Sequence, residues 1–218
     1  MKKMIGKFLE LERNDQVVFF LLLTTISNVM MAFIKLFFSL YLPSMWFFVN
    51  AIFNIILALL RTFSIKDYRK MRFESDEKVK SKIGFKNYLN NGVLLMILGI
   101  AYFLVSVYMY FKNPINNMHE YMTYLMALIA FWSIGSAIYG MCKYRKNNNP
   151  IIAATKITNF SNALASIVLT QVVLLDTFGN GVDVRIWNGL TGMLVSITIM
   201  ILGLYMFISI KKYYDFDS

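Results

Sequence analysis

A few polar side chains interrupt the long apolar runs of this 218-residue sequence, and these residues are the candidates for chemistry. Lys35 is the only charge well inside the first run, about 8 residues, or roughly 12 Å of helix, before Pro43. A charge this deep in an apolar helix is costly, so it needs a partner, a long reach to the surface or a polar surrounding. Two interpretations follow: Lys35 serves a polar cavity, or it is a structural tether.

Two further polar groups have helical spacing. Asn50 and Asn54 lie in the second apolar run, and Thr158 and Asn162 lie in the fifth. Residues at positions i and i+4 share one face of a helix, so each pair predicts a polar face. Two such faces either enclose a small cavity for a solute or an ion, or hydrogen-bond neighbouring helices together. The sequence leaves both interpretations open.

The residue types that bind metals and perform catalysis are scarce. His119 is the only histidine and Cys142 the only cysteine, which excludes a histidine-based metal site and a disulfide framework. The apolar runs contain no pair of carboxylates, so acid–base and nucleophilic catalysis lack their usual groups. We therefore expect no enzyme activity, no metal and no cofactor.

The composition indicates that most of the chain lies in lipid. Hydrophobic residues make up 58% and charged residues 16%, against about 45–50% and about 25% in soluble domains. A helix needs roughly 20 apolar residues to cross a bilayer. Six segments qualify: 17–42, 44–63, 89–111, 121–142, 151–175 and 187–210. The expected fold class is all-α, a polytopic membrane protein with six transmembrane helices.

Basic residues predict the orientation, because Lys and Arg concentrate in short cytoplasmic loops. Four precede the first span, nine lie in 61–88, three in 143–146 and two in the tail, against Lys112 and Arg185 on the opposite side. We expect a cell-membrane protein with both termini in the cytoplasm. Its parts are an interfacial segment at 1–15, a transmembrane domain at 16–210 with a cytoplasmic loop at 64–88, and a tail at 211–218.

The formal net charge of +10 is explained by this topology and does not indicate nucleic-acid binding. Basic residues on a cytoplasmic face attract anionic lipid headgroups. The expected partners are therefore the bilayer and its anionic headgroups, with no nucleic acid.

The order of residues along the chain resembles the cation diffusion facilitator transporters. The order and spacing of eight residues resemble the first helical hairpin of that family: Asn28, Ala32, Lys35, Leu36, Ser39, Ser44, Asn50 and Ala51. Its third, fifth and sixth helices resemble residues 87–96 (NYLNNGVLLM), 153–166 (AATKITNFSNALAS) and 188–205 (NGLTGMLVSITIMILGLY). The resemblance implies a six-helix bundle, exchange of a metal ion for protons, and a metal site between the second and fifth helices.

The chain departs from the family at the metal site itself. The resemblance places the four His or Asp ligands at Phe53, Leu57, Thr158 and Asn162. Phe53 and Leu57 offer no ligand atom, and the neutral oxygens of Thr158 and Asn162 do not titrate near neutral pH. Zinc requires imidazole, thiolate or carboxylate ligands. We expect no zinc/proton exchange at this site.

We also expect no counterpart of the family's soluble carboxy-terminal domain, because only KKYYDFDS follows Ile210. A homodimer, if formed, would assemble through the membrane helices.

The resemblance, together with the lack of zinc ligands, predicts a transporter-like protein that moves another small cation or a polar solute. The alternative is a membrane scaffold or accessory subunit that does not transport.

Overall fold

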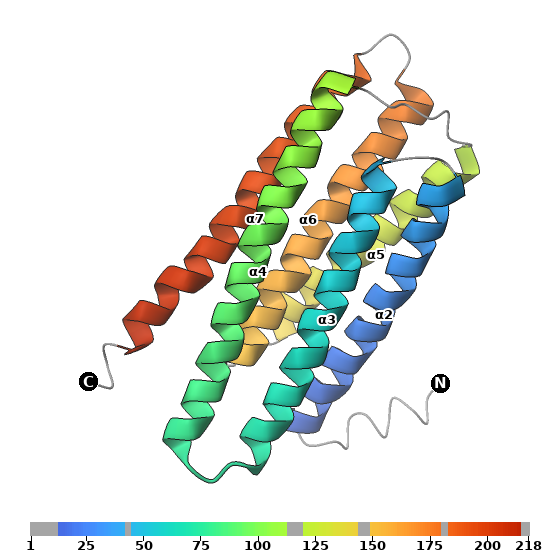
Figure 1. Cartoon of the computed structure of the whole chain (residues 1–218). Coiled ribbons are helices and arrows are strands. Elements are labelled where there is room, and N and C mark those ends of the chain that lie inside the picture. The colour runs from blue at the N-terminus through green and yellow to red at the C-terminus, as the bar shows by residue number, and fades with distance from the viewer. Residues whose placement is uncertain (1–12, 42–44, 113–119, 144–148, 180–182, 215–218) are drawn as a thin grey trace, which may run out of the picture.

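The computed structural model describes residues 13–41, 45–112, 120–143, 149–179 and 183–214, and all of its regular structure is α-helical. The six helices are α2 (Arg13–Tyr41), α3 (Met45–Phe73), α4 (Glu77–Lys112), α5 (Glu120–Lys143), α6 (Pro150–Phe178) and α7 (Val184–Tyr214). They run lengthwise beside one another as a single bundle (Figure 1). The all-α fold class is confirmed.

Five of these helices are long and apolar enough to cross a membrane: α2, α3, α4, α6 and α7. The apolar part of α5 is shorter, Thr123–Tyr139. Long apolar side chains cover the outside of the bundle, among them Phe33, Phe131 and Leu194. Because so large an apolar surface is unfavourable in water, the chain is a multi-pass membrane protein in contact with the bilayer.

Residues 64–88 were expected to form a cytoplasmic loop, but most of them are helical. Helix α3 continues to Phe73 and α4 begins at Glu77, so only residues 74–76 are not helical. The many charged residues of this stretch indicated a loop, but they belong to an amphipathic extension of α3. Its buried face packs Ile65 and Tyr68 against Leu21 of α2 and against Ile151 and Ile152 of α6.

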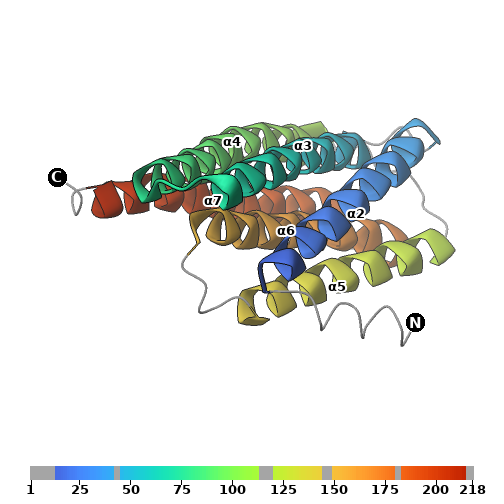
Figure 2. The same ribbon diagram turned by 90° about the horizontal axis from the view of Figure 1, so that it is seen from below.

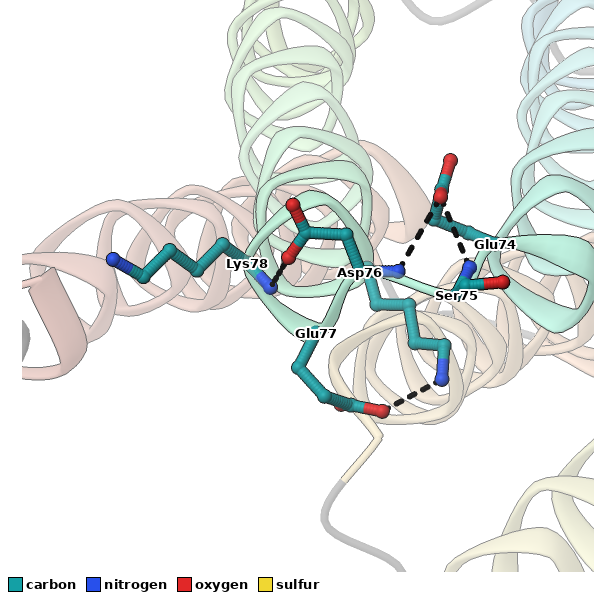
Figure 3. Close-up of polar contacts among 6 residues, drawn as sticks. Glu74, Ser75, Asp76, Glu77 and Lys78 are labelled. Atoms are coloured by element: carbon teal, nitrogen blue, oxygen red, sulfur yellow. Dashed lines mark hydrogen bonds and ion pairs between the residues drawn. The ribbon is translucent and has the colours of Figure 1, made fainter.

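The connection between α3 and α4 is a tight turn built by its own acidic side chains (Figure 3). The Glu74 carboxylate accepts a 2.9 Å hydrogen bond from the main-chain N–H of Ser75. The Asp76 carboxylate accepts one of 2.9 Å from the N–H of Lys78, in the first turn of α4. A carboxylate at this position satisfies an N–H that has no partner within the helix, so it caps the start of α4.

The ends of the chain also differ from the expected boundaries. Helix α2 already begins at Arg13, and α7 runs on to Tyr214 into the segment expected as a tail. Residues 1–12, most of the expected interfacial segment, and residues 215–218 lie outside the described part of the chain.

Helices α4 and α7 pack closely along their length (Figure 1). Glycines permit the approach: a Cβ atom on Gly203 would lie 2.7 Å from the main-chain oxygen of Gly92, and one on Gly99 would lie 2.6 Å from Cγ of Met200. Real Cβ atoms do not come this close to other heavy atoms, so these positions require glycine for the observed spacing.

Helices α3 and α6 both contact α4, and α6 also contacts α7; Figure 2 shows the bundle from below. Helix α2 packs against α3, α5 packs against α6, and α3 contacts α6. Tyr102 of α4 packs against α3, with its ring centroid 5.7 Å from that of Trp46 and 6.1 Å from that of Phe53.

Candidate functional site

A small polar cavity of about 40 Å³ lies among α2, α3, α5 and α6. Since one water needs about 10–15 Å³ of such space, the cavity has room for roughly three waters or a small solute. Amide and cationic side chains supply most of its polar lining: Asn28, Lys35, Asn54, Arg61, Asn159 and Asn162. Hydroxyl groups of Thr24, Ser27, Ser133 and Ser166 complete it.

Three of the five residues predicted from sequence meet at this cavity. Lys35 comes from α2, Asn54 from α3 and Asn162 from α6. Asn54 and Asn162, from the second and fifth expected spans, therefore line the same cavity. Asn162 also donates a long 3.4 Å hydrogen bond to Ser133 of α5, which closes that side of the cavity.

The other two predicted residues do not line the cavity. Asn50 donates to the main-chain oxygen of Trp46 at 2.9 Å and to the Tyr102 hydroxyl at 3.3 Å, so it bonds α3 to α4. Thr158 donates to the main-chain oxygen of Thr155, within its own helix. Of the two interpretations of Asn50, a cavity residue or a hydrogen bond between helices, the bond to Tyr102 agrees with the second.

Arg61 lines the cavity but was not among the site residues predicted from the sequence, and the same holds for Asn28 and Asn159. Arg61 was counted with the charged connection, but the side chain is only 4% exposed. It donates to the main-chain oxygen of Thr24 at 2.6 Å and to Oδ1 of Asn159. Its spacing from Asn54 was the available signal, because a step of seven residues returns to the same helix face.

Many polar atoms around the cavity have no protein partner. Nδ2 of Asn28, Oδ1 of Asn54, Nε of Arg61 and Oδ1 of Asn162 are buried and make no hydrogen bond. All four residues line the same cavity. Buried polar atoms are nearly always hydrogen-bonded, so such a concentration indicates a space that holds water or a polar solute.

The electrostatics of the cavity are positive. Lys35 and Arg61 are 3% and 4% exposed, and the described lining contains no Asp or Glu. Lys35 from α2 and Arg61 from α3 therefore both place a positive charge at the cavity.

Two of the four positions at which the family resemblance implied metal ligands, Phe53 and Leu57, carry no ligand atom. Phe53 and Leu57 are fully buried in the apolar core of the bundle. Across the part of the chain that the structure describes, no three His, Cys, Asp or Glu side chains gather in one place. The chemistry available at the site is hydrogen bonding and charge, without titratable carboxylates.

Comparison of the chain with known proteins finds no family model and no curated protein that matches it. Its class therefore rests on its own features. It is a polytopic α-helical membrane protein with a buried polar cavity among four of its helices.

Proposed function

We propose that this protein is transporter-like and admits a small polar solute to the cavity among α2, α3, α5 and α6. The observation that carries the proposal is the set of four unpaired buried polar atoms, on Asn28, Asn54, Arg61 and Asn162, around one cavity. A helix contact that served only for adhesion would pair these atoms with one another, because each unpaired buried group costs about 1–3 kcal/mol.

The charge of the cavity selects between the solute classes that the sequence left open. A small cation would enter beside Lys35 and Arg61 with no acidic side chain in the described lining to offset the repulsion. Zinc/proton exchange is disfavoured for the same reason and because ligands are lacking at Phe53 and Leu57. A polar solute without positive charge fits best.

The proposal is tested by solute flux into proteoliposomes. Purified protein is reconstituted, and the entry of small polar solutes is followed by light scattering, with neutral solutes and salts compared. We expect flux through the wild-type protein and a loss of at least about tenfold in Asn54→Leu and Asn162→Leu, which remove hydrogen-bonding groups from the cavity. Asn90→Leu is the matched control, because Asn90 is exposed on α4.

The alternative of a non-transporting scaffold or accessory subunit predicts a different result. No solute class would then enter faster than in protein-free vesicles, while all three variants would remain folded. That outcome would reject the transporter proposal. Equal flux in the wild-type protein and both cavity variants would also reject it, because the solute would then use another route.

The proposed setting is the cell membrane with both termini in the cytoplasm. The support is the run of basic residues around the α3–α4 turn, which suits the cytoplasmic face and its anionic headgroups. The exposed thiol of Cys142 tests this orientation. An impermeant maleimide should label Cys142 in permeabilised cells and not in intact cells. Any homodimer would form through the membrane helices, and crosslinking in native membranes would detect it.

A further inference from the structure

We propose that the solute bound in the cavity is a small monovalent anion, held between the cationic groups of Lys35 and Arg61. This inference rests on the proposed function, because it names the ligand class of the same cavity. It differs from the expectation of a small cation or a polar solute, because it takes the two cationic groups at the cavity into account.

Charge balance is the first argument. Two basic side chains at most 4% exposed lie at one cavity, and the described lining has no acidic side chain to pair with them. Lys35 makes no hydrogen bond or ion pair within the described part of the chain. Buried charges are normally paired, so a mobile anion is the simplest counter-charge for this site.

The donor groups are the second argument. Nε of Arg61 and Nδ2 of Asn28 are buried donors without acceptors. With the ammonium group of Lys35 they provide three kinds of N–H donor from two neighbouring helices. Charge-assisted hydrogen bonds from such groups are the usual means of holding chloride or a small oxyanion.

Size and the remaining polar atoms limit the ligand further. About 40 Å³ accommodates an anion of a few atoms and does not accommodate a sugar acid or a nucleotide. The unpaired oxygens on Asn54 and Asn162 cannot bond an anion directly. A water that donates to one of them and to the anion would satisfy both, so the ligand is expected to bind partly hydrated.

The test measures thermal unfolding of detergent-solubilised protein while gluconate is replaced by chloride, nitrate or formate at constant ionic strength. A ligand that binds only the folded state raises the melting temperature as its concentration rises. We expect a rise with the three small anions and none with gluconate, which is too large. Lys35→Met should weaken the apparent affinity by about tenfold or more.

Two further variants separate the effect of the positive charge at position 35 from the effect of removing any lysine charge. Lys35→Arg keeps the positive charge and should keep the response to anions. Lys82→Met removes an exposed charge on α4 and should respond as the wild-type protein does. If Lys35→Met does not fold, bromide-soaked crystals of the wild-type protein decide the matter. An anomalous peak between Lys35 and Arg61 supports the proposal, and an empty cavity overturns it.

The results also separate this inference from the proposed function. A response that is absent, or equal in the wild-type protein and Lys35→Met, overturns the anion site. Flux of neutral solutes that persists beside such a result leaves the transporter proposal standing. Anion binding without any flux supports the site and rejects transport.

Discussion

Arg61 of α3 donates a 2.6 Å hydrogen bond to the main-chain oxygen of Thr24 in α2. Its second terminal nitrogen donates to Oδ1 of Asn159 in α6. One guanidinium group thus connects three helices at the edge of the cavity. The planar group has five donors, so Arg61 can bond both helices while its Nε still has no hydrogen-bond partner.

Replacing Arg61 should therefore weaken the bundle as well as the site. We expect Arg61→Met to lower the free energy of unfolding by about 1–3 kcal/mol, because it removes the hydrogen bonds that Arg61 donates to Thr24 and Asn159. Thermal unfolding in detergent measures the change. Lys66→Met, at an exposed position of the same helix, is the control and should be nearly neutral. Equal stability of the two variants would mean that the guanidinium contacts contribute nothing.

The contact between α4 and α7 should be sensitive to side-chain size at Gly203. A Cβ atom there would meet the main-chain oxygen of Gly92 at 2.7 Å, and Gly203→Leu is expected to destabilise the protein by about 1–3 kcal/mol or more through overpacking. Gly135→Ala on α5 provides a control, because nothing lies within 4 Å of its added Cβ. That variant should be neutral or stabilising, since alanine favours helix more than glycine does. The melting temperatures of both variants test this contrast.

The start of α6 depends on a side-chain cap. Oδ1 of Asn149 accepts a 2.9 Å hydrogen bond from the main-chain N–H of Ile151, directly before Pro150 opens the helix. We expect Asn149→Ala to lower the free energy of unfolding by about 1 kcal/mol, and Asn149→Asp to retain most of it because aspartate also caps. Chemical denaturation in mixed micelles can resolve the difference. A full loss in the aspartate variant would show that another contact of Asn149 matters more.

The turn before α7 should show a pH effect of known sign. The Arg185 guanidinium donates to the Asp183 carboxylate at 3.1 and 3.2 Å and holds the pKa of Asp183 below its ordinary value. A depressed pKa in the folded state means that this stabilising contact is present at neutral pH. The contact is lost as the pH falls through the folded-state pKa. Carboxyl NMR of labelled protein should show the pKa of Asp183 rise toward the ordinary value in Arg185→Gln. An unchanged pKa in that variant would exclude Arg185 as the cause.

Part of the candidate site was accessible from the sequence. Lys35, Asn54 and Asn162 stand out because polar residues in long apolar runs are costly and therefore few. Arg61 was not predicted, because the many charged residues that follow it in the sequence indicated a solvated loop. The sequence left two interpretations of Asn50 open, and in the structure it bonds Tyr102 of α4 and does not line the cavity.

The sequence alone determined that the chain is helical and lies in lipid. Runs of bilayer length with few charges have no other stable arrangement, because a helix satisfies every backbone hydrogen bond within its own segment. Only the tertiary structure decided which polar residues share a cavity and that its charge is positive. Those properties depend on which helices become neighbours and how each is rotated about its axis. The helix contacts set both, through residues far apart in the chain, such as Thr24, Arg61 and Asn159.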